Sequence, residues 1–522
     1  MPVHYNDGLD DQLAYDLTGT FIGGQVSNVR ANLLKDSQFS EAKNMDIDRF
    51  GAITTRRGTS LVGSTLTDPI LGLSYFDTPS YEEILAVSNG VLYKSTGSSF
   101  SSVSGYSPQA TNNVEFAQLV DKVYMSSGET SSDPDTTYYV GGGTSCTSVS
   151  AAPKSKYLVT HTNRLFAANT ENYDDEVAAS DLLDGGTWGS SFQFRVGGGE
   201  GDPIVGIVSW YNFNLLVFKK RSIHVISTDP SQVTAANWNV HRIDNTVGCE
   251  SHRTIAQAGA DVFFLARDGV RTVRTILSGA QSSVSEPISI PVDDYIKRIN
   301  WSHASKSCAK FWNNRYIISV PIDSSTTPNY TLVFNTITKS WSGYWTGWTP
   351  LCFSESGFSS FPKMIMGDSS GNVSTWLDYI SESSESISTF QDNGTDYASK
   401  LVTRAHVFGD YLSPKLGNHV DVELQGHIAG SSSGSFLTTL DGAGGSAEIA
   451  LEEGLSNAGT TNALPIDMPF NLPTVRVINK SYNLTTKGEF NEIQFIAHWS
   501  SGYLHVRSIK ASAYMNTMAL EK

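Results

Sequence analysis

Short apolar runs recur along the chain in pairs, and the turn between the two runs of a pair is rich in Gly, Asn or Asp. In the first pair, residues 84–87 are apolar, residues 88–90 read Ser-Asn-Gly, and a second β-prone run covers residues 91–94. An Asn-Gly dipeptide between two such runs is typical of a tight hairpin turn. The pattern predicts two antiparallel strands joined by this turn.

The same paired pattern returns along the chain at intervals of about 40 to 50 residues, the period expected of four-stranded propeller blades. Further pairs begin at residues 116, 157, 205, 254, 308 and 364. Radial packing of such units buries both faces of each sheet and leaves only short edges. We therefore expect an all-β fold with a β-propeller of about six blades over residues 61–380. Ordinary hairpins stacked in sandwiches are the alternative.

Two segments have a helical pattern. Residues 36–44 are long enough for two or three turns, and residues 292–299 for two. The second segment has acidic residues in its first turn and basic residues in its last, as the helix dipole prefers. Neither segment is long enough to organise a domain.

A Ser- and Glu-rich stretch at residues 381–388 indicates a boundary, and a new strand pattern begins beyond it. Polar and apolar residues alternate there, which is typical of half-buried antiparallel strands. We expect a β-sandwich-like platform or accessory domain over residues 395–522, interrupted by a flexible Gly/Ser region at residues 430–445. Residues 1–60 are expected to form an N-terminal arm and a first β-hairpin.

Composition supports a β-rich protein without sequence-specific nucleic-acid binding. Only 17% of residues are charged, and 52 acidic against 36 basic side chains give a net charge of -16. Long surface helices need the Glu, Lys, Arg and Ala that are scarce here. The negative charge opposes binding to nucleic acid and to anionic membranes at long range, although DNA that merely passes nearby is compatible with it.

The sequence shows no membrane-spanning segment, no signal peptide and no cysteine pattern typical of disulfides or zinc. No apolar run reaches the roughly 18 residues of a membrane span, and the first residues lack a basic region followed by an apolar one. We expect no membrane anchor and no secretion signal. The four cysteines have no C-x-x-C spacing, which predicts neither a disulfide framework nor a zinc ribbon.

Some stretches match the residue pattern of a catalytic motif, but the sequence around them does not fit the structure that the motif needs. Residues 430–434 fit G-x-S-x-G, but the match lies in a Gly/Ser-rich stretch without the strand, turn and helix of a nucleophile elbow. Residues 197–201 are Gly-rich but lack the Lys of a phosphate-binding loop. Adjacent acids such as Asp293 and Asp294 would point to opposite faces of a strand. We expect no enzyme activity, no cofactor and no metal.

The N-terminal region carries the most specific motif. Asn44, Gly51, Arg56 and Gly58 fit the pattern N-x6-G-x-[LI]-x2-R-x-G, after the sequence Phe-Ile-Gly-Gly-Gln-Val-Ser at residues 21–27. The two glycines suit tight turns, and Arg56 with Arg57 could pin the strand to an acidic neighbour. A plain β-hairpin is compatible with the same residues.

Together with stretches at residues 162–181, 245–270 and 367–373, this motif resembles the tail nozzle proteins of short-tailed bacteriophages, the group that contains tail tubular protein B. The resemblance spans about residues 20 to 376. It implies a structural virion protein of the viral tail, assembled in the host cytoplasm. Its partners would be further copies in a ring, commonly a hexamer, the portal-adaptor ring and, as a further candidate, tail fibres.

In such a ring the protein would retain the genome and conduct DNA ejection. Carboxylates facing the lumen would repel the DNA backbone, whereas Lys or Arg would hold it. Asp133 and Asp135 are the residues we expect at the lumen or gate. The Trp/Tyr-rich residues 341–348 fit a blade edge, a subunit contact or core packing equally well.

Two other classes remain open on the sequence. One is a carbohydrate-binding or glycan-hydrolysing β-propeller of a phage tail, which would place aromatic and acidic residues around the propeller axis. The other is a secreted bacterial adhesion protein, which the missing signal peptide disfavours.

Overall fold

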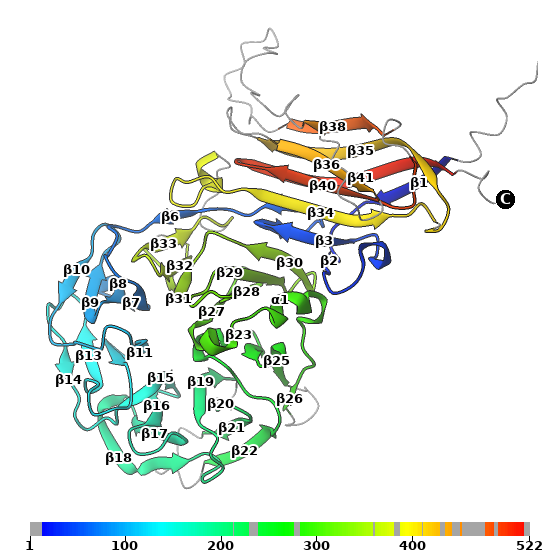
Figure 1. Ribbon diagram of the computed structural model, residues 1–522. Coiled ribbons are helices and arrows are strands. Elements are labelled where there is room, and N and C mark those ends of the chain that lie inside the picture. Colours follow the sequence, from blue (N-terminus) through cyan, green and yellow to red (C-terminus); the bar gives the residue numbers. More distant parts are fainter. Residues whose placement is uncertain are drawn as a thin grey trace, which may run out of the picture.

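The structure is a computed structural model of the chain. It describes residues 13–211, 213–228, 238–275, 282–358, 361–379, 387–409, 411–427, 434–440, 449–450, 476–484 and 489–515. Within these residues the chain forms a ring of small sheets and, beside it, a two-sheet platform (Figure 1).

Seven four-stranded units make up the ring, and in the first six the strands run outward from an innermost strand in sequence order. Blades one to three are formed by β7 (Ile70–Thr78) to β10 (Ser101–Val103), with β8 (Tyr81–Ser88) and β9 (Val91–Ser95); by β11 (Glu115–Leu119), β12 (Lys122–Ser126), β13 (Thr137–Val140) and β14 (Thr147–Ser148); and by β15 (Ser155–His161), β16 (Arg164–Thr170), β17 (Glu176–Asp181) and β18 (Asp184–Arg195). Blades four and five are formed by β19 (Ile204–Trp210), β20 (Asn214–Lys219), β21 (Ile223–Ser227) and β22 (Asn239–Asp244); and by β23 (Ala256–Ala258), β24 (Asp261–Ala266), β25 (Gly269–Thr275) and β26 (Ser282–Val284). Blades six and seven are formed by β27 (Cys308–Trp312), β28 (Arg315–Val320), β29 (Tyr330–Asn335) and β30 (Ser340–Trp345); and by β31 (Pro350–Ser356), β32 (Lys363–Asp368) and β33 (Val373–Trp376) together with β6 (Thr59–Leu61).

The hairpin predicted around Asn-Gly is present. β8 pairs with β9 in antiparallel register, and the turn residues Asn89 and Gly90 have φ values of 48° and 72°. Two consecutive residues with positive φ match the right-handed twist of the flanking strands, and Asn-Gly tolerates this conformation best. The local sequence alone therefore specifies this turn.

The ring closes through strands that are far apart in the sequence. β6 precedes blade one but pairs with β33, so that Ser60 lies opposite Thr375 and completes blade seven. The predicted β-propeller is confirmed, and its blades number seven rather than about six. The last blade has only three consecutive strands, so the repeat along the sequence does not reveal it as a complete unit.

Polar side chains also join neighbouring blades. The His161 ring at the end of β15 lies 2.8 Å from Ser209 Oγ through Nδ1 and 2.8 Å from Thr228 Oγ1 through Nε2, and both hydroxyls belong to blade four. Burial disfavours the charged imidazolium and lowers the pKa of His161 to about 4. The interface between blades three and four thus contains a neutral histidine.

Strands from both ends of the chain build the platform. One sheet contains β1 (Leu13–Thr18), β4 (Met45–Ile47), β5 (Ile53–Thr55), β35 (Lys415–His427), β38 (Arg476–Asn483), β39 (Glu489–Phe490) and β41 (Tyr503–Met515). The other contains β2 (Gly24–Gln25), β3 (Gln38–Lys43), β34 (Ser399–His406), β36 (Gly434–Leu440), β37 (Ile449–Ala450) and β40 (Ile493–Trp499), and continues through β3 into blade six. A shared core joins N-terminal side chains such as Phe21 and Phe39 to C-terminal ones such as Trp499.

Several local expectations change with this packing. The segment expected as a separate N-terminal arm belongs to the platform core, because Phe39 and Ala42 are fully buried there. Most of residues 36–44 belongs to strand β3 instead of a helix, since pairing with β34 supplies the hydrogen bonds that a short helix cannot keep. The second predicted helix is present as α1 (Asp293–Lys297), after the 3-10 turn η5 (Ile290–Val292). Within the expected flexible region 430–445, residues 434–440 form β36, and the rest lies outside the described residues.

We predict that His161 makes the protein less stable as the pH falls from about 6.5 to about 4. The unfolded histidine binds a proton near its ordinary pKa of about 6.5, whereas the folded one has a pKa of about 4. Because the unfolded state binds more protons in this window, this group contributes a loss of up to about 1.4 kcal/mol per pH unit. Urea unfolding at about pH 7 and about pH 5 should show a smaller loss in His161→Gln than in the native protein. The exposed His241 provides the control His241→Gln, which should follow the native curve; equal losses in all three proteins would contradict the prediction.

Candidate functional site

Three of the motif residues, Asn44, Arg56 and Gly58, lie where the platform meets the propeller, a region that we call the joint, and Gly51 lies in the turn between β4 and β5 of the platform. Arg56 directly follows strand β5 and has no exposed side-chain surface. Its Nη1 and Nη2 donate to Asp392 Oδ1 and Oδ2 at 2.9 and 2.5 Å. A two-point contact of this kind fits the planar guanidinium and holds both groups in one orientation.

The other contacts of Arg56 keep its charge in this buried place. Nη2 also donates to the Thr346 carbonyl at 3.1 Å, just beyond blade six. The guanidinium lies 3.9 Å from the centre of the Tyr397 ring and 5.0 Å from that of Trp348. The Asp392 charge raises the pKa of Arg56 although burial opposes it. A paired, hydrogen-bonded and ring-stacked cation is a stable arrangement, but one that depends on every partner.

Asn44 connects the same elements. Its φ is 54°, a left-handed conformation that Asn accepts more readily than most residues. Its Oδ1 accepts from Arg56 Nε at 3.2 Å and from the Thr346 N–H at 2.8 Å, and its Nδ2 donates to the Ala398 carbonyl at 2.8 Å. One side chain thus joins the N-terminal strands, blade six and the segment leading into β34.

The two glycines are required by close backbone approach. A Cβ on Gly58 would lie 1.9 Å from the Gln391 carbonyl oxygen, and the Gly58 N–H donates to Thr389 O at 2.8 Å. Gly51 has a φ of 86°, and a Cβ there would lie 2.1 Å from Thr20 Oγ1. Asn44, Arg56 and Gly58 therefore act at the joint, whereas Gly51 lies in the turn of the β4–β5 hairpin and contacts Thr20 within the platform.

Tryptophans fill the remaining space in the joint. Trp345 Nε1 donates to the Met45 carbonyl at 2.7 Å, and Trp376 Nε1 donates to Arg57 O at 3.2 Å. Trp341, Trp345 and Trp348 are all buried within the chain. The Trp/Tyr-rich stretch 341–348, for which the sequence left three interpretations, includes most of the outermost strand of blade six and packs in the core, Trp341 against blade five and Trp345 and Trp348 against blade seven.

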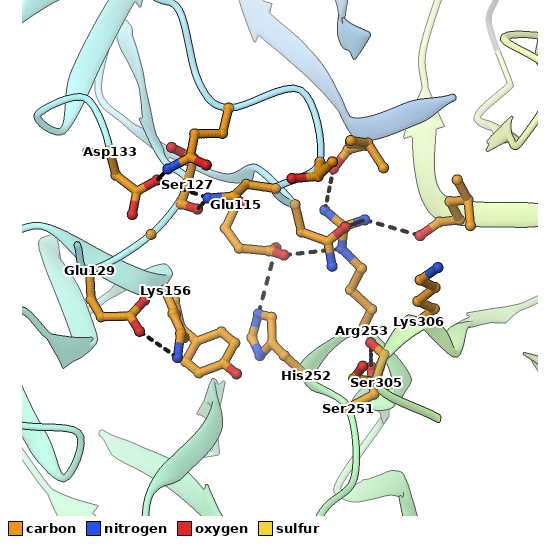
Figure 2. A pocket seen from close by; sticks show the side chains of 18 of the residues that line it. Glu115, Ser127, Glu129, Asp133, Lys156, Ser251, His252, Arg253, Ser305 and Lys306 are labelled. Atoms are coloured by element: carbon orange, nitrogen blue, oxygen red, sulfur yellow. Dashed lines mark hydrogen bonds and ion pairs between the residues drawn. The ribbon is translucent and has the colours of Figure 1, made fainter. Parts of the chain in front are cut away.

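A cavity of about 840 Å³ opens at the propeller axis, among the loops that precede the innermost strands (Figure 2). Arg253, in the 3-10 turn η4 (His252–Thr254) before blade five, reaches across it. Its Nη atoms donate to the carbonyls of Leu71, Val114 and Leu351 at 2.7, 3.0 and 3.0 Å. These carbonyls belong to or directly precede the innermost strands of blades one, two and seven.

Figure 2 shows Glu115 between Arg253 and His252. Glu115 Oε1 accepts from Arg253 Nε at 3.0 Å, and Oε2 lies 3.7 Å from His252 Nε2. Burial lowers the pKa of His252, whereas the Glu115 charge raises the pKa of Arg253. Beside them, Lys156 Nζ lies 2.6 Å from Glu129. Glu115, His252, Arg253, Glu129 and Lys156 are therefore paired with one another, and the contacts of Arg253 hold blades together.

The two residues expected at a lumen or gate differ in exposure. Asp133 lines the cavity but is only 3% exposed, and it accepts from Asn112 Nδ2 at 2.8 Å and the Thr130 N–H at 2.9 Å. Its carboxylate is thus used to hold its own loop. Asp135 is more exposed and lies 3.7 Å from Lys154 Nζ. Of the two, Asp135 alone presents its carboxylate at the surface.

Sequence reasoning assigned no role to Glu115, His252 and Arg253. The stretch 245–270, which contains His252 and Arg253, resembles nozzle proteins, but the resemblance gives these two residues no role. Arg253 precedes a β-strand, where it has no partner within its own hairpin. This position was the one feature of the sequence that indicated a long-range partner for Arg253. Its partners on blades one, two and seven follow only from ring closure.

The described residues contain no group of three or more His, Cys, Asp or Glu side chains that could hold a metal ion. Among the same residues, none of the helices has the length and apolar character needed to cross a bilayer. The four cysteines are not disulfide-bonded, and Cys249, Cys308 and Cys352 are buried.

No protein-family model matches the chain, and no curated protein matches it. Among solved structures, the chain is similar to the β-propeller domain of Cps50 (Swd1) from Myceliophteria thermophila. The two share 11% sequence identity with a TM-score of 0.42, and the match covers 61% of this chain and 99% of that domain.

We predict that Arg56→Met destabilises the protein by about 3 to 5 kcal/mol, because it leaves Asp392 without its cation in a largely buried position. Arg56→Lys should also be destabilising, since Lys keeps the charge but cannot make the two-point contact. Urea unfolding measures both. Arg298→Ala, which removes an exposed pair with Asp323, is the matched control and should cost at most about 1 kcal/mol. Native-like stability of Arg56→Met would contradict this account of the joint.

Proposed function

We propose that this protein is a structural subunit of the tail nozzle of a short-tailed bacteriophage. Further copies would form a ring, as a homohexamer, below the portal-adaptor ring, and the ring would retain the genome and conduct its ejection. The observation that carries the proposal is the joint. Asn44, Arg56 and Gly58 of the motif that resembles nozzle proteins act together there to fix a platform against a propeller, and Gly51 forms the turn of the platform hairpin beside them.

A passive structural role also agrees with the chemistry at the axis. Glu115 contacts Arg253 and His252, and Lys156 contacts Glu129, so these charged groups hold the protein rather than a substrate. Glycan-binding sites use aromatic faces and unpaired carboxylates. Among the described residues, Tyr157 is the one Phe, Tyr or Trp that lines the cavity. These features favour the nozzle proposal over the glycan-binding alternative.

The route of DNA in this proposal runs between copies, at the centre of the ring. Arg253 joins four blades at the axis of each propeller, so that axis is an element of stability. The net charge of -16 would keep a DNA backbone from adhering to the lumen. Asp135, on the exposed side of its loop, is the gate candidate that we retain.

Electron microscopy of the purified protein, alone and mixed with portal-adaptor complexes, tests the nozzle role. We expect ring-shaped assemblies that cap the adaptor end of the complex, because a nozzle must continue the portal channel. Portal complexes without the adaptor are the control and should remain uncapped. A monomer that ignores the adaptor but cleaves or binds polysaccharide would contradict the proposal.

The gate assignment is tested by Asp135→Lys in assembled phage particles. A lysine at the lumen would hold the DNA backbone, so we expect slower genome release in a triggered ejection assay, with a larger delay at low salt. Asp133→Asn serves as the comparison, because Asp133 holds its loop and should change thermal stability rather than salt-dependent release. Unchanged retention and ejection in Asp135→Lys would reject this position as a gate.

A further inference from the structure

Three turns of the propeller carry large apolar residues in a backbone conformation that such residues avoid. Val120, Leu183 and Phe213 have φ values of 56°, 59° and 60°. Their side chains are 61%, 58% and 58% exposed. The left-handed region favours Gly, Asn and Asp, and a β-branched or bulky residue there is strained. Elsewhere in the chain the left-handed turn positions include Asn89, Asn313 and Asn314.

These three turns lie side by side on one face. Val120 is in the turn after β11, Leu183 is in the turn between β17 and β18, and Phe213 is in the turn after β19. The Thr160 hydroxyl donates to Gln118 O at 2.6 Å, which joins the ends of β11 and β15. His161 then joins β15 to β19. The turns thus project together from blades two, three and four.

This face, which we call the tip surface, is apolar with an acidic edge. It consists of Val120, Leu182, Leu183, Tyr211 and Phe213. It lies at the ends of the innermost strands, whereas the axial cavity lies where these strands begin. Exposed Asp121 and Asp184 adjoin it, while the nearby cation Lys122 lies over the Tyr138 ring. Strain and exposure at the same residues are unfavourable in an isolated chain and point to an interaction surface.

A second surface has the complementary character, and we call it the seam surface. It consists of Val29, Arg30, Leu33, Lys35 and Ile290. Val29, Leu33 and Ile290 are 46%, 70% and 51% exposed. Asn28 Nδ2 donates to the Ile290 carbonyl at 2.7 Å, so the platform loop and η5 form one continuous surface.

A shallow groove of about 370 Å³ adjoins the seam surface and is lined in part by Val26, Val29, Ala31 and Val402. Two acids in the groove are engaged: Glu41 accepts from Lys400 Nζ at 2.8 Å, and Asp294 accepts from the Ser27 hydroxyl. The exposed Asp36 at its edge lies 3.1 Å from Arg404. Among the described residues, the exposed Arg30 and Lys35 make no ion pair, so these two side chains are the cations that the seam surface offers to a partner.

We infer that the tip surface of one copy docks on the seam surface of a second copy of this chain. The projecting apolar turns would pack on the exposed Val29, Leu33 and Ile290, and the acidic edge of the tip surface would face Arg30 and Lys35. Two tip surfaces facing each other would bring Asp121 against Asp121, and the acidic edge also opposes an anionic lipid surface. The contact is head-to-tail, so repeated use generates a ring or an open filament. It rests on the proposed function only for the expectation that the ring closes.

Two variants separate the surfaces. In the tip variant, Val120, Leu183 and Phe213 are all replaced by Asn, which suits left-handed backbone and should leave thermal stability equal or higher. The seam variant combines Arg30→Glu and Lys35→Glu. Mass photometry of the native protein should show concentration-dependent oligomers, and each variant should assemble with a dissociation constant at least about tenfold higher. Ile337→Asn, at an exposed position in the turn of blade six, is the control and should assemble like the native protein.

Mixing the two variants gives the decisive result. Each variant keeps one intact surface, so an equimolar mixture should form one-to-one dimers and nothing larger. A native protein that stays monomeric, a folded tip variant that assembles like the native protein, or a mixture without dimers would overturn the inference. Oligomers that need both surfaces but do not bind portal-adaptor complexes would support this contact and contradict the nozzle role.

Discussion

The structure depends most on a single buried ion pair. Arg56 has no exposed side-chain surface, and its pair with Asp392 joins residues that are 336 positions apart in the chain. A buried cation is tolerable only while its carboxylate and hydrogen-bond partners stay in place. Because Asn44, Thr346 and Tyr397 complete these contacts, the orientation of the platform on the propeller is determined at the same point.

This constraint also acts on the ring. Arg56 stands three positions before β6, which closes blade seven by pairing with β33. The strands just before Arg56 belong to the platform core, which the C-terminal strands share. A short N-terminal segment thus takes part in both folding units, so displacing it would open the propeller and expose the platform core together. At the propeller axis, Arg253 joins its own blade to three others through their backbone carbonyls.

The sequence predicts much of the fold and part of the joint. Hairpins such as β8–β9 follow from local turn chemistry, and the motif residues 44–58 stand out because their spacing is specific. The helix expected at residues 36–44 is wrong, because pairing of β3 with β34 outweighs local propensity. Local sequence patterns did not predict the number of blades. The seventh blade needs β6 and β33 in one sheet, although about 310 residues of chain separate them.

By itself, the sequence determined what nearest neighbours control: strand content, turn types such as Asn89-Gly90, the charge balance and the positions of Gly and Arg in the motif. Only the tertiary structure decided which carboxylate meets Arg56, that Arg253 binds three other blades, and that Asp133 holds a loop while Asp135 is exposed. The physical reason is range. Turn and strand preferences act over a few residues, whereas a buried charge is paired by whatever chain closure brings within hydrogen-bond distance.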